Sequence, residues 1–392
     1  MENYDVAIVG GGAAGLACAV TLKQLNSNLS VIIVEAGERL GKKIAATGNG
    51  QGNLSNADMT AKHYHGGCAY LAKILCEDKA VNPLTLFDFL TVTDKVGRRY
   101  PAGKQASAIS DSLIKRLSSL GVKVLCGCPV VSIGKNLNIT LNNGTSLKAK
   151  KVLISTGGKA QKQFLTDGSA YSLATSLGHS LTPLYPSLVQ LKCAGGFKQL
   201  KGIRSECRVT VLNSNGKKIA TTDGDVIFTD YGLSGNAVFY ASAYCTGQKG
   251  VTLSIEFLPE ADKEEIVKII KMRQSSGYAE NELLGGTLHN ALGREIIKRC
   301  KNKSAEGIAE MVKNFPVTVE GSLGFDYAQV TKGGIPSSEI TENLESKIVN
   351  GLYFAGEILD VDGDCGGYNL HFAFASGMYA AQCINQSILR GQ

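Results

Sequence analysis

At residues 4–15 the chain reads Tyr4-Asp-Val-Ala-Ile-Val-Gly-Gly-Gly-Ala-Ala-Gly15, an apolar run that ends in spaced glycines. A helical pattern follows at once, and a second apolar run, Val31-Ile-Ile-Val-Glu35, closes on an acid. In such a unit Gly10 permits a tight turn, Gly12 lets backbone approach a pyrophosphate, and Gly15 lets helix pack on strand. Amides at the helix N-terminus would hold the phosphates, and the acid would take a ribose hydroxyl. The stretch therefore predicts a dinucleotide-binding βαβ unit and leaves open which dinucleotide it binds.

Length and composition describe a well-packed protein of several domains. The 392 residues exceed one typical core, which favours two or three domains. Hydrophobic residues make up 44% and charged residues 19%. No apolar run reaches the roughly 18 residues that a membrane span needs. The first residues lack the basic region of a signal peptide, so we expect a cytoplasmic protein without a membrane span.

Charge and cysteine usage exclude two further classes of function. The net charge of +7 is spread along the chain, and the cluster Lys148-Ala-Lys-Lys151 fits the flank of a strand better than a phosphate-binding surface. We therefore expect no nucleic-acid partner. The eleven cysteines contain no C-x-x-C pair, and the five histidines lack the spacing of a ligand set. Reduced thiols and no metal site are expected.

The pattern beyond Glu35 predicts a nucleotide-binding domain that is interrupted. A polar, glycine-rich loop covers residues 41–56, and a helical region is expected at about 66–92. Asn142-Asn-Gly144 between two alternating runs predicts a hairpin, and residues 151–158 predict a buried strand that enters a glycine turn. From residue 351 the chain resumes this character, with a strand at 352–357 and a long helix at 368–389.

The intervening segment has a different character. Residues 188–258 alternate in the manner of strands, whereas residues 260–316 switch to helical spacing, as in the stripe Ile308, Met311, Val312 and Phe315. We therefore predict three parts. They are a discontinuous nucleotide-binding domain (1–187 plus 322–392), a β-rich insert (188–258) and a helical insert (259–321).

Three further motifs favour FAD over a nicotinamide dinucleotide. The strand that ends in Thr156-Gly-Gly158 is of the kind that passes beside the cofactor in FAD-binding two-dinucleotide-fold proteins. Glu357 follows an apolar strand, where an acid can bind the ribityl hydroxyls that only a flavin has. Gly363-Asp-Cys-Gly-Gly-Tyr-Asn-Leu370 opens the last helix, and its free amides would face the flavin edge that becomes negative on reduction. The predicted fold class is α/β: an FAD-binding two-dinucleotide fold (glutathione-reductase-like Rossmann domain) interrupted by a β-rich and a small helical module.

Residue for residue, these motifs resemble one family of bacterial flavoproteins, which includes aminoacetone oxidases and reductases of unsaturated bile-acid or steroid ketones. The resemblance covers nearly the whole chain. It rests on Gly41-Lys-Lys-Ile-Ala-Ala-Thr-Gly-Asn-Gly50, Gly97-Arg-Arg-Tyr-Pro101, Ser155-Thr-Gly-Gly158, Phe228-Thr-Asp-Tyr-Gly-Leu-Ser-Gly235, Val330-Thr-Lys-Gly-Gly-Ile335 and residues 356–370. It implies an FAD domain that carries one β-rich and one helical insert module.

One loop departs from the family's pattern. Where the family usually reads Gly-Arg-Cys-Asn, this chain has Gly50-Gln-Gly-Asn53. A cation and a thiol beside the flavin are therefore absent, which argues against an anion-recognition role for this loop.

The motifs together predict the residues that bind the cofactor. The set comprises Gly10, Gly12, Ala13, Ala14, Gly15, Glu35, Lys43, Thr47, Asn49, Asn53, Val130, Thr156, Gly157, Gly158, Gly356, Glu357, Gly367, Asn369 and Leu370. Residues 36–67 contain no cysteine, and a second G-x-G-x-x-G is missing, which excludes the flavin disulfide reductases. NAD(P)H stays open as a transient electron donor, beside quinols or a partner flavoprotein.

The favoured function is reduction of an activated C=C bond in a small hydrophobic ketone such as a steroid or bile acid. Such a reaction needs hydride from flavin N5 and a donor that protonates the enolate side. The candidate donors are Tyr231, Tyr368 and His371, because phenols and imidazole donate hydrogen bonds at neutral pH. The alternatives are an amine oxidase of the aminoacetone type and a non-catalytic FAD-binding redox sensor or accessory protein.

Overall fold

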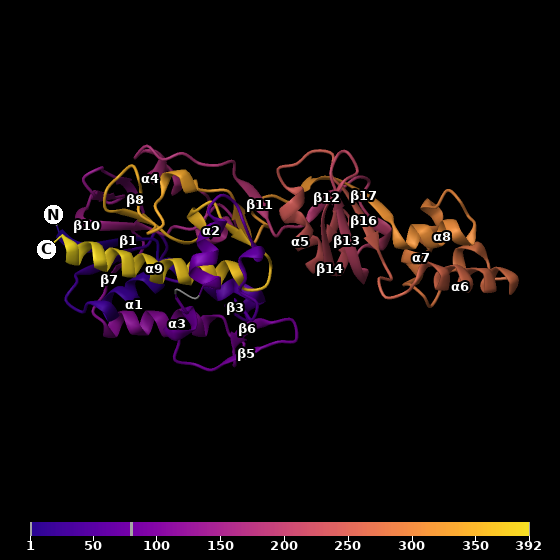
Figure 1. Cartoon of the computed structure of the whole chain (residues 1–392), viewed down its shortest axis with the longest axis horizontal. Coiled ribbons are helices and arrows are strands. Elements are labelled where there is room, and N and C mark those ends of the chain that lie inside the picture. Colours follow the sequence, from indigo (N-terminus) through magenta and orange to yellow (C-terminus); the bar gives the residue numbers. More distant parts are fainter. Residues whose placement is uncertain (1, 79–80, 392) are drawn as a thin grey trace. The chain divides into compact units, whose positions relative to one another are not determined.

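A computed structural model describes residues 2–78 and 81–391, and the chain forms two compact units. Unit 1 comprises Met1–Tyr185 and Val330–Gln392, and unit 2 is the continuous segment Pro186–Gln329 (Figure 1). The chain thus leaves unit 1 once, in β11 (Tyr185–Ser187), and returns at residue 330. The division of the insertion into two modules at residue 258 stays a prediction.

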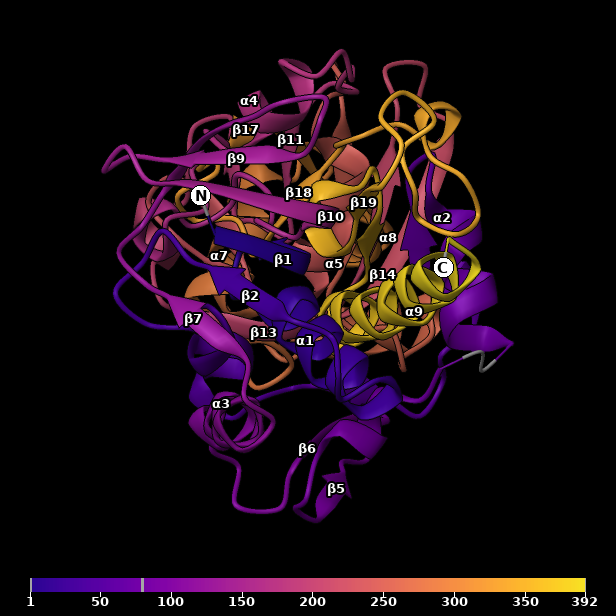
Figure 2. The ribbon, with the colours of Figure 1, turned by 90° about the vertical axis from the view of Figure 1, so that its left-hand side faces the viewer.

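Unit 1 is built on a mixed sheet whose strands follow the order β7–β2–β1–β10–β9–β8, with β19 also paired to β10 (Figure 2). Strands β7, β2, β1, β10 and β19 are parallel, and β9 and β8 are antiparallel additions. Their bounds are β1 Glu2–Val9, β2 Val31–Val34, β7 Lys123–Leu125, β8 Val130–Ile133, β9 Asn138–Leu141, β10 Ser146–Ile154 and β19 Leu352–Phe354. Strand β2 is buried along its whole length, which explains its uninterrupted apolar run. The α/β fold class is therefore confirmed.

The carboxyl ends of the parallel strands meet at one edge of the sheet. Val9 of β1 pairs with Val34 and with Ile154, and Ile154 pairs in turn with Phe354. The residues that follow these four therefore lie side by side; they are Gly10, Glu35, Ser155 and Ala355. Ligands of open α/β sheets bind at this edge. Residues that lie 25 to 345 positions after Gly10 in the sequence thus meet at this edge of the sheet.

Helices α1 (Ala13–Leu25) and α9 (Tyr368–Arg390) pack directly against each other (Figure 2). A Cβ atom at Gly377 of α9 would overlap the carbonyl oxygen of Ala14, so the two helices approach at backbone distance. The buried Ser376 hydroxyl also accepts a hydrogen bond from Gly356 N at 3.0 Å. Helix α9 therefore anchors both the first helix and the turn after β19, and the long helix predicted at 368–389 is confirmed.

The helical region predicted at about 66–92 is confirmed only in part, at residues 69–77 and 83–86. Helix α2 (Ala69–Ala72) continues as a π-helical turn to Glu77, and Pro83–Leu86 forms a 3₁₀ turn. Residues 79–80 of the prediction lie outside the described residues. A proline is not tolerated in a helix interior, and Thr91–Thr93 forms strand β5 because β-branched residues favour strands.

Two small sheets flank the start of α9. Strands β3 (Ser55–Asn56), β6 (Arg98–Pro101) and β5 form one, and β4 (Tyr64–His65) pairs with β20 (Asp362–Gly363) in the other. Helix α3 (Ser107–Ser119) packs on α1, and α4 (Tyr171–Thr175) lies near β8. These pieces bring residues 53–65 next to residues 362–371.

Unit 2 contains a closed barrel of six antiparallel strands in the order β12–β15–β14–β13–β16–β17. They span Leu191–Cys193, Gly232–Ser234, Lys218–Phe228, Arg204–Leu212, Thr252–Glu256 and Phe315–Ser322, respectively. Helix α5 (Asn236–Cys245) packs on β13 and β14; it is helical where the sequence predicts strand character. Its small apolar residues are buried on most sides and show little helical periodicity, which explains the miss.

Three more helices in unit 2 follow the predicted spacing. They are α6 (Lys263–Ser275), α7 (Asn290–Arg299) and α8 (Ala305–Lys313). The predicted helical stripe Ile308, Met311, Val312 and Phe315 is wrong in its last residue. Phe315 is the first residue of β17 and packs in the barrel core. Residues spaced for a helix can belong to a strand when they sit at the junction of the two.

Candidate functional site

Of the four glycines after β1, protein atoms enclose Gly10, Gly11 and Gly15, and only Gly12 faces open space. Gly10 has a φ of +101°, and a Cβ there would lie 2.7 Å from the carbonyl oxygen of Ser155. A Cβ at Gly15 would overlap the carbonyl oxygen of Gly10. At Gly12, the N-cap of α1, a Cβ would meet no described atom within 4 Å. The first amides of α1 have no partner within the helix, so this opening suits a phosphate group.

Glu35 follows β2, and two backbone amides hold its carboxylate. Oε2 accepts a hydrogen bond from Gly11 N and Oε1 accepts one from Gly37 N, both at 2.7 Å. Each carboxylate oxygen keeps a further lone pair, so the group can still accept from a ribose hydroxyl. The acid therefore stands in a fixed position beside the glycine turn.

The turn after β10 carries a buried hydroxyl without a protein partner. Thr156 Oγ1 is buried and has no hydrogen-bond partner in the part of the chain that is described. Gly158 faces Thr331 of β18 (Val330–Lys332), where a Cβ would lie 2.5 Å from Thr331 Oγ1. The Thr331 hydroxyl accepts hydrogen bonds from Lys159 N and Ala160 N, at 2.7 and 3.0 Å. The turn is thus fixed from one side while Thr156 stays ready for a ligand.

Lys43 and Glu357 form a half-buried ion pair at the end of β19. Lys43 Nζ lies 2.9 Å from Glu357 Oε2, and their side chains are 25% and 19% exposed. Glu357 Oε1 accepts a second hydrogen bond, from Thr331 N at 2.8 Å. Two residues that the sequence predicts separately as flavin contacts therefore act as one charged unit. Thr331 supports this unit and the turn after β10 together.

The glycine-rich loop 41–56 is tied to the first turn of α9. With the Asn53 amide oriented to satisfy both of its neighbours, its oxygen accepts from Gly367 N at 3.1 Å and its nitrogen donates to Ser55 O at 3.2 Å. Asn49 in the same loop has a left-handed φ of +53° and is exposed. The Thr47 hydroxyl donates to Ile44 O at 2.7 Å. The loop therefore lies at the N-terminus of α9, where the sequence predicts the flavin edge.

His371 and Tyr368 lie on the first turns of α9 and are both buried. His371 Nδ1 lies 2.8 Å from Ser55 Oγ. Burial, assisted by the nearby Arg99 guanidinium, lowers the pKa of His371 to about 4. At neutral pH the ring is therefore uncharged and carries one N–H. The Tyr368 ring stacks on His63 with ring centroids 4.4 Å apart.

The other predicted site residues have varied surroundings. The Asn369 side chain accepts from Gly363 N and donates to Gly363 O, both at 2.7 Å, so it closes the turn before α9. Leu370 packs against the unit 1 core, and Val130 opens β8, where it pairs with Leu141. Tyr231 belongs to unit 2, between β14 and β15. Its role as a proton donor stays a prediction.

Two contributors are missing from the sequence-based set of site residues. Thr331 bridges Glu357 and the β10 turn, and Ser55 pairs with His371. Thr331 belongs to the motif Val330-Thr-Lys-Gly-Gly-Ile335, so its hydroxyl could have been considered as a site residue from the sequence. Ser55 carries no such signal, because its pairing spans 316 positions.

The residues at the sheet edge fit FAD. The open space at Gly12, the fixed carboxylate of Glu35 and the buried hydroxyl of Thr156 suit a dinucleotide along the carboxyl ends of β1, β2 and β10. The Lys43–Glu357 pair and the first amides of α9 are then placed to contact the polar atoms of a flavin. No helix among residues 2–78 and 81–391 is long and apolar enough to cross a membrane.

Comparison with known proteins finds relatives along nearly the whole chain. A family model described as the HI0933-like protein Rossmann domain matches residues 4–383. A 3-dehydro-bile acid delta(4,6)-reductase of Clostridium scindens is 33% identical over 96% of this chain and 98% of its own length. A ribosomal RNA dihydrouridine synthase of Escherichia coli K12 is 27% identical over 97% of this chain and 98% of its own.

Solved structures show the same fold at lower identity. A 3-ketosteroid-delta4-(5alpha)-dehydrogenase from Rhodococcus jostii RHA1, in complex with 4-androstene-3,17-dione, superposes with a TM-score of 0.52. The match covers 98% of this chain and 97% of that one at 16% identity. At this identity the likeness is one of fold.

Proposed function

The chain belongs to the HI0933-like Rossmann-domain family and is an FAD-dependent oxidoreductase, and we propose that it reduces a C=C bond conjugated to a carbonyl group. The substrate we propose is a small hydrophobic ketone such as a steroid or bile-acid enone. The observation that carries this proposal is the 33% identity, along nearly the full length of both chains, with a reductase named for such a substrate.

The names of the two relatives describe one kind of chemistry. A 3-dehydro bile acid with a double bond at carbon 4 is an enone, and uridine carries a C=C bond conjugated to a ring carbonyl. Reduction in either case adds a hydride at the β-carbon and a proton at the α-carbon. The reaction class is therefore supported by both relatives, although their substrates differ in size and polarity.

The residues of the chain have separable tasks in such a reaction. When bound, FAD supplies the hydride. The amides at the start of α1 and the Glu35 carboxylate would hold the adenosine diphosphate part of FAD, and the Lys43–Glu357 pair would bind the polar part of the flavin. The first amides of α9 would stabilise the negative charge that a bound flavin carries when it is reduced.

The proton of the reaction needs a donor near the substrate's α-carbon. We propose Tyr368 on α9 as the donor and His371 on the same helix as a residue that orients it. His371 is uncharged at neutral pH because its pKa is lowered to about 4, so it can orient a hydroxyl through its single N–H but holds no extra proton to give. A tyrosine is the better candidate for the transferred proton.

The test uses the purified flavoprotein, reduced under anaerobic conditions with NADPH, NADH or dithionite. It is then mixed separately with an enone steroid, with the corresponding saturated ketone and with air. We expect the enone alone to reoxidise the flavin rapidly and to gain two hydrogens by mass spectrometry. Rapid reoxidation by air without any effect of the enone would instead support the amine oxidase alternative. Slow reoxidation by all three would favour a non-catalytic FAD protein.

A second substrate class is favoured by a specific observation. Relatives named ribosomal RNA dihydrouridine synthase match 97% and 98% of the chain at 27% identity. A uracil in RNA is therefore the alternative substrate that we propose. A ribosomal RNA fragment added to the same anaerobic assay distinguishes the two: a gain of two hydrogens in a uridine, with no reaction of the enone, would replace the ketone by RNA.

A further inference from the structure

The Arg99 side chain of β6 carries a positive charge that has no counter-ion among the described residues. Arg99 is half-buried, and its Nε atom is buried without a hydrogen-bond partner among residues 2–78 and 81–391. Within the same residues its guanidinium forms no ion pair. An unsatisfied donor of a charged group is costly inside a protein. An uncompensated cation of this kind is therefore a candidate binding group for a ligand.

The pairing of β6 with β3 decides where this guanidinium lies. Arg99 stands directly opposite Ser55 in the antiparallel pair, and residues opposite each other point to the same face of a sheet. Ser55 Oγ lies 2.8 Å from His371 Nδ1 of α9. Burial, and after it the positive charge of Arg99, lowers the pKa of His371 to about 4. Both observations place the guanidinium beside the first turns of α9.

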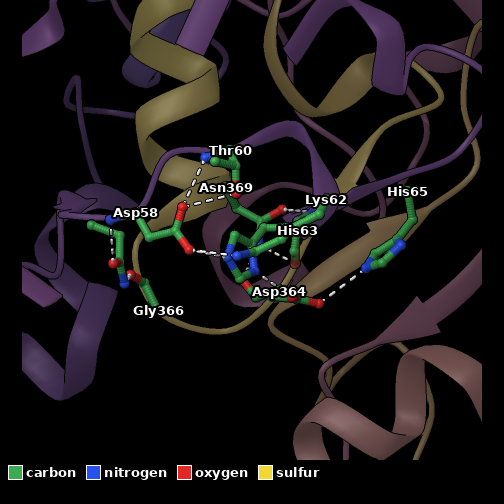
Figure 3. A network of polar contacts seen from close by, with 10 residues as sticks. Asp58, Thr60, Lys62, His63, His65, Asp364, Gly366 and Asn369 are labelled. Carbon is green, nitrogen blue, oxygen red and sulfur yellow. Dashed lines mark hydrogen bonds and ion pairs between the residues drawn. The ribbon is translucent and has the colours of Figure 1, made fainter. Parts of the chain in front are cut away.

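Two carboxylates in this part of unit 1 already have other partners (Figure 3). Asp364, in the turn that opens α9, lies 2.9 Å from His63 Nδ1 and 3.0 Å from His65 Nε2. Asp58 Oδ2 lies 3.2 Å from His63 Nε2 and 2.8 Å from Lys62 Nζ. The two acids and their partners thus form a network of their own, and the guanidinium on β6 has no ion pair with it.

The surroundings of Arg99 favour a negatively charged oxygen. The N-terminus of a helix carries a partial positive charge, and α9 is a long helix of 23 residues. His371 is uncharged at neutral pH because of its lowered pKa. A guanidinium presents several N–H donors in one plane, and this geometry matches an oxyanion or a carboxylate. A ligand that brings such an oxygen would satisfy Arg99 and lie in the favourable field of the helix.

The proposed reaction produces such an oxygen. When hydride is added to the β-carbon of an enone, the C=C electron pair moves between the α-carbon and the carbonyl carbon, and the C=O pair moves onto oxygen. Proton transfer to the α-carbon then restores the C=O bond. The negative oxygen is thus bonded to the carbon next to the one that takes the proton. Tyr368, the proposed proton donor, and His371, beside Arg99, are three positions apart and share one face of α9.

We propose that Arg99 binds the carbonyl oxygen of the substrate and stabilises the negative charge that forms there when hydride is added. The proposal rests on the proposed function and deepens it, since it names the residue that recognises the carbonyl group. Arg99 itself gives up no proton, because a guanidinium is not deprotonated in proteins, and Tyr368 supplies the proton. A steroid enone and a uracil both carry such an oxygen, so the assignment applies to either substrate.

The test uses the oxidised, FAD-loaded protein and 4-hydroxybenzaldehyde, whose phenolate oxygen resembles an enolate oxygen. Binding is measured from the flavin absorption spectrum at a pH at which the phenol is ionised. We expect Arg99→Gln to raise the dissociation constant about tenfold or more. The neutral 4-methoxybenzaldehyde should bind the wild type and the variant alike. Lys95→Gln is the matched control and should behave as the wild type, because Lys95 is an exposed cation in the turn between β5 and β6.

The anaerobic reaction with an enone steroid gives a second readout. Arg99→Gln should slow the reoxidation of the reduced flavin by the enone on the order of 100-fold, as the loss of one oxyanion-binding donor does. Arg99→Lys should restore part of the rate, because it restores the charge but not the planar set of donors. A wild type that the enone does not reoxidise would contradict the proposed function, whereas phenolate binding would still decide the role of Arg99.

A third measurement uses the wild type and keeps the test valid if Arg99→Gln folds poorly. Because the Arg99 Nε–H is buried, its proton is shielded from exchange with water and can be followed by NMR in isotope-labelled protein. This signal, assigned by its loss in Arg99→Lys, should shift when the phenolate binds and stay in place with the methyl ether. A signal that the phenolate leaves unmoved would overturn the proposal. So would a wild type that binds no phenolate, equal phenolate affinities of the wild type and a folded Arg99→Gln, or an equal loss of affinity for the methyl ether.

Discussion

Gly12 and Gly15 stand three positions apart in one motif, yet different partners require them. A Cβ at Gly15 would overlap protein backbone, whereas a Cβ at Gly12 would meet no described atom. Gly12 also has φ −82° and ψ −164°, which alanine adopts without strain. The protein fold therefore needs Gly15, and we propose that FAD binding is what requires Gly12.

The substitution Gly12→Ala should weaken FAD binding without destabilising the protein. The added methyl group occupies the space through which backbone approaches the pyrophosphate, and we expect at least a tenfold rise in the dissociation constant, about 1.4 kcal/mol. The melting temperature of the flavin-free protein should stay unchanged. Gly15→Ala is the contrasting variant, and it should lower that melting temperature because the methyl group forces α1 away from β1. Equal losses of stability in both variants would contradict this division.

The Lys43–Glu357 pair illustrates what a residue-by-residue analysis of the sequence can reach. Both residues are identifiable from their motifs, but their 2.9 Å contact joins positions that are 314 apart. Nothing in either motif indicates the other. The spacing within a motif predicts that a residue contacts the cofactor. Only the tertiary structure shows with which distant residue it pairs.

Helices α1 and α9 form the element on which the site depends most. The first amides of α1 are those that we propose bind the pyrophosphate of FAD, and those of α9 lie beside the loop 41–56. The two helices are locked together where Gly377 meets Ala14, and Ser376 connects α9 to the turn after β19. A change in the spacing of these helices would therefore move both ends of the cofactor site.

The substitution Gly377→Ala should destabilise unit 1 and weaken FAD binding together. The methyl group would overlap the Ala14 carbonyl oxygen, and forced separation of packed helices costs about 1–3 kcal/mol. Thermal unfolding and FAD titration of the same preparation measure both effects. Gly103→Ala is the control, since a Cβ there meets no described atom within 4 Å. Normal FAD affinity in a destabilised Gly377→Ala would show that helix spacing does not set the site.

At the scale of the whole molecule, two buried histidines make unit 1 sensitive to acid. Burial lowers the pKa of His179, which contacts Glu339 and Ser346, and lowers the pKa of His371 to about 4. A histidine with a depressed pKa binds its proton more readily in the unfolded chain than in the fold. Stability is therefore complete above the ordinary value of 6.5, and it declines as the pH falls toward 4.

The substitution His371→Asn should flatten this acid sensitivity in α9. An asparagine can keep a hydrogen bond to Ser55 and has no proton to take up. In the wild type, the His371 pKa of about 4 lies below the ordinary value of 6.5, and this difference corresponds to a loss of about 3 kcal/mol in the free energy of opening α9 when the pH falls to 4. Hydrogen exchange of α9 peptides between pH 4 and pH 7, corrected for the intrinsic rate, measures it. His289→Asn in unit 2 should leave the α9 curve as in the wild type, and a wild-type curve without slope would refute the assignment.

The parts of the fold that the sequence predicts well are those with a local cause. Turn glycines, the uninterrupted apolar run of β2, the Asn142-Asn-Gly144 hairpin and the long last helix all depend on neighbours in the chain. The errors occur where tertiary context overrides local spacing. Residues 66–92 are helical only at 69–77 and 83–86, α5 is a helix in a strand-like region, and Phe315 belongs to a strand.

By itself the sequence determined a Rossmann sheet with a dinucleotide site at its carboxyl edge, because each of those features follows from hydrogen bonding and sterics within a few residues. Only the tertiary structure decided which distant side chains meet: Lys43 with Glu357, Ser55 with His371, and His63 with Asp364. These pairings depend on strand register and on the contact between α1 and α9. A shift of one residue in either would send the same side chains to other partners, and no local pattern encodes that choice.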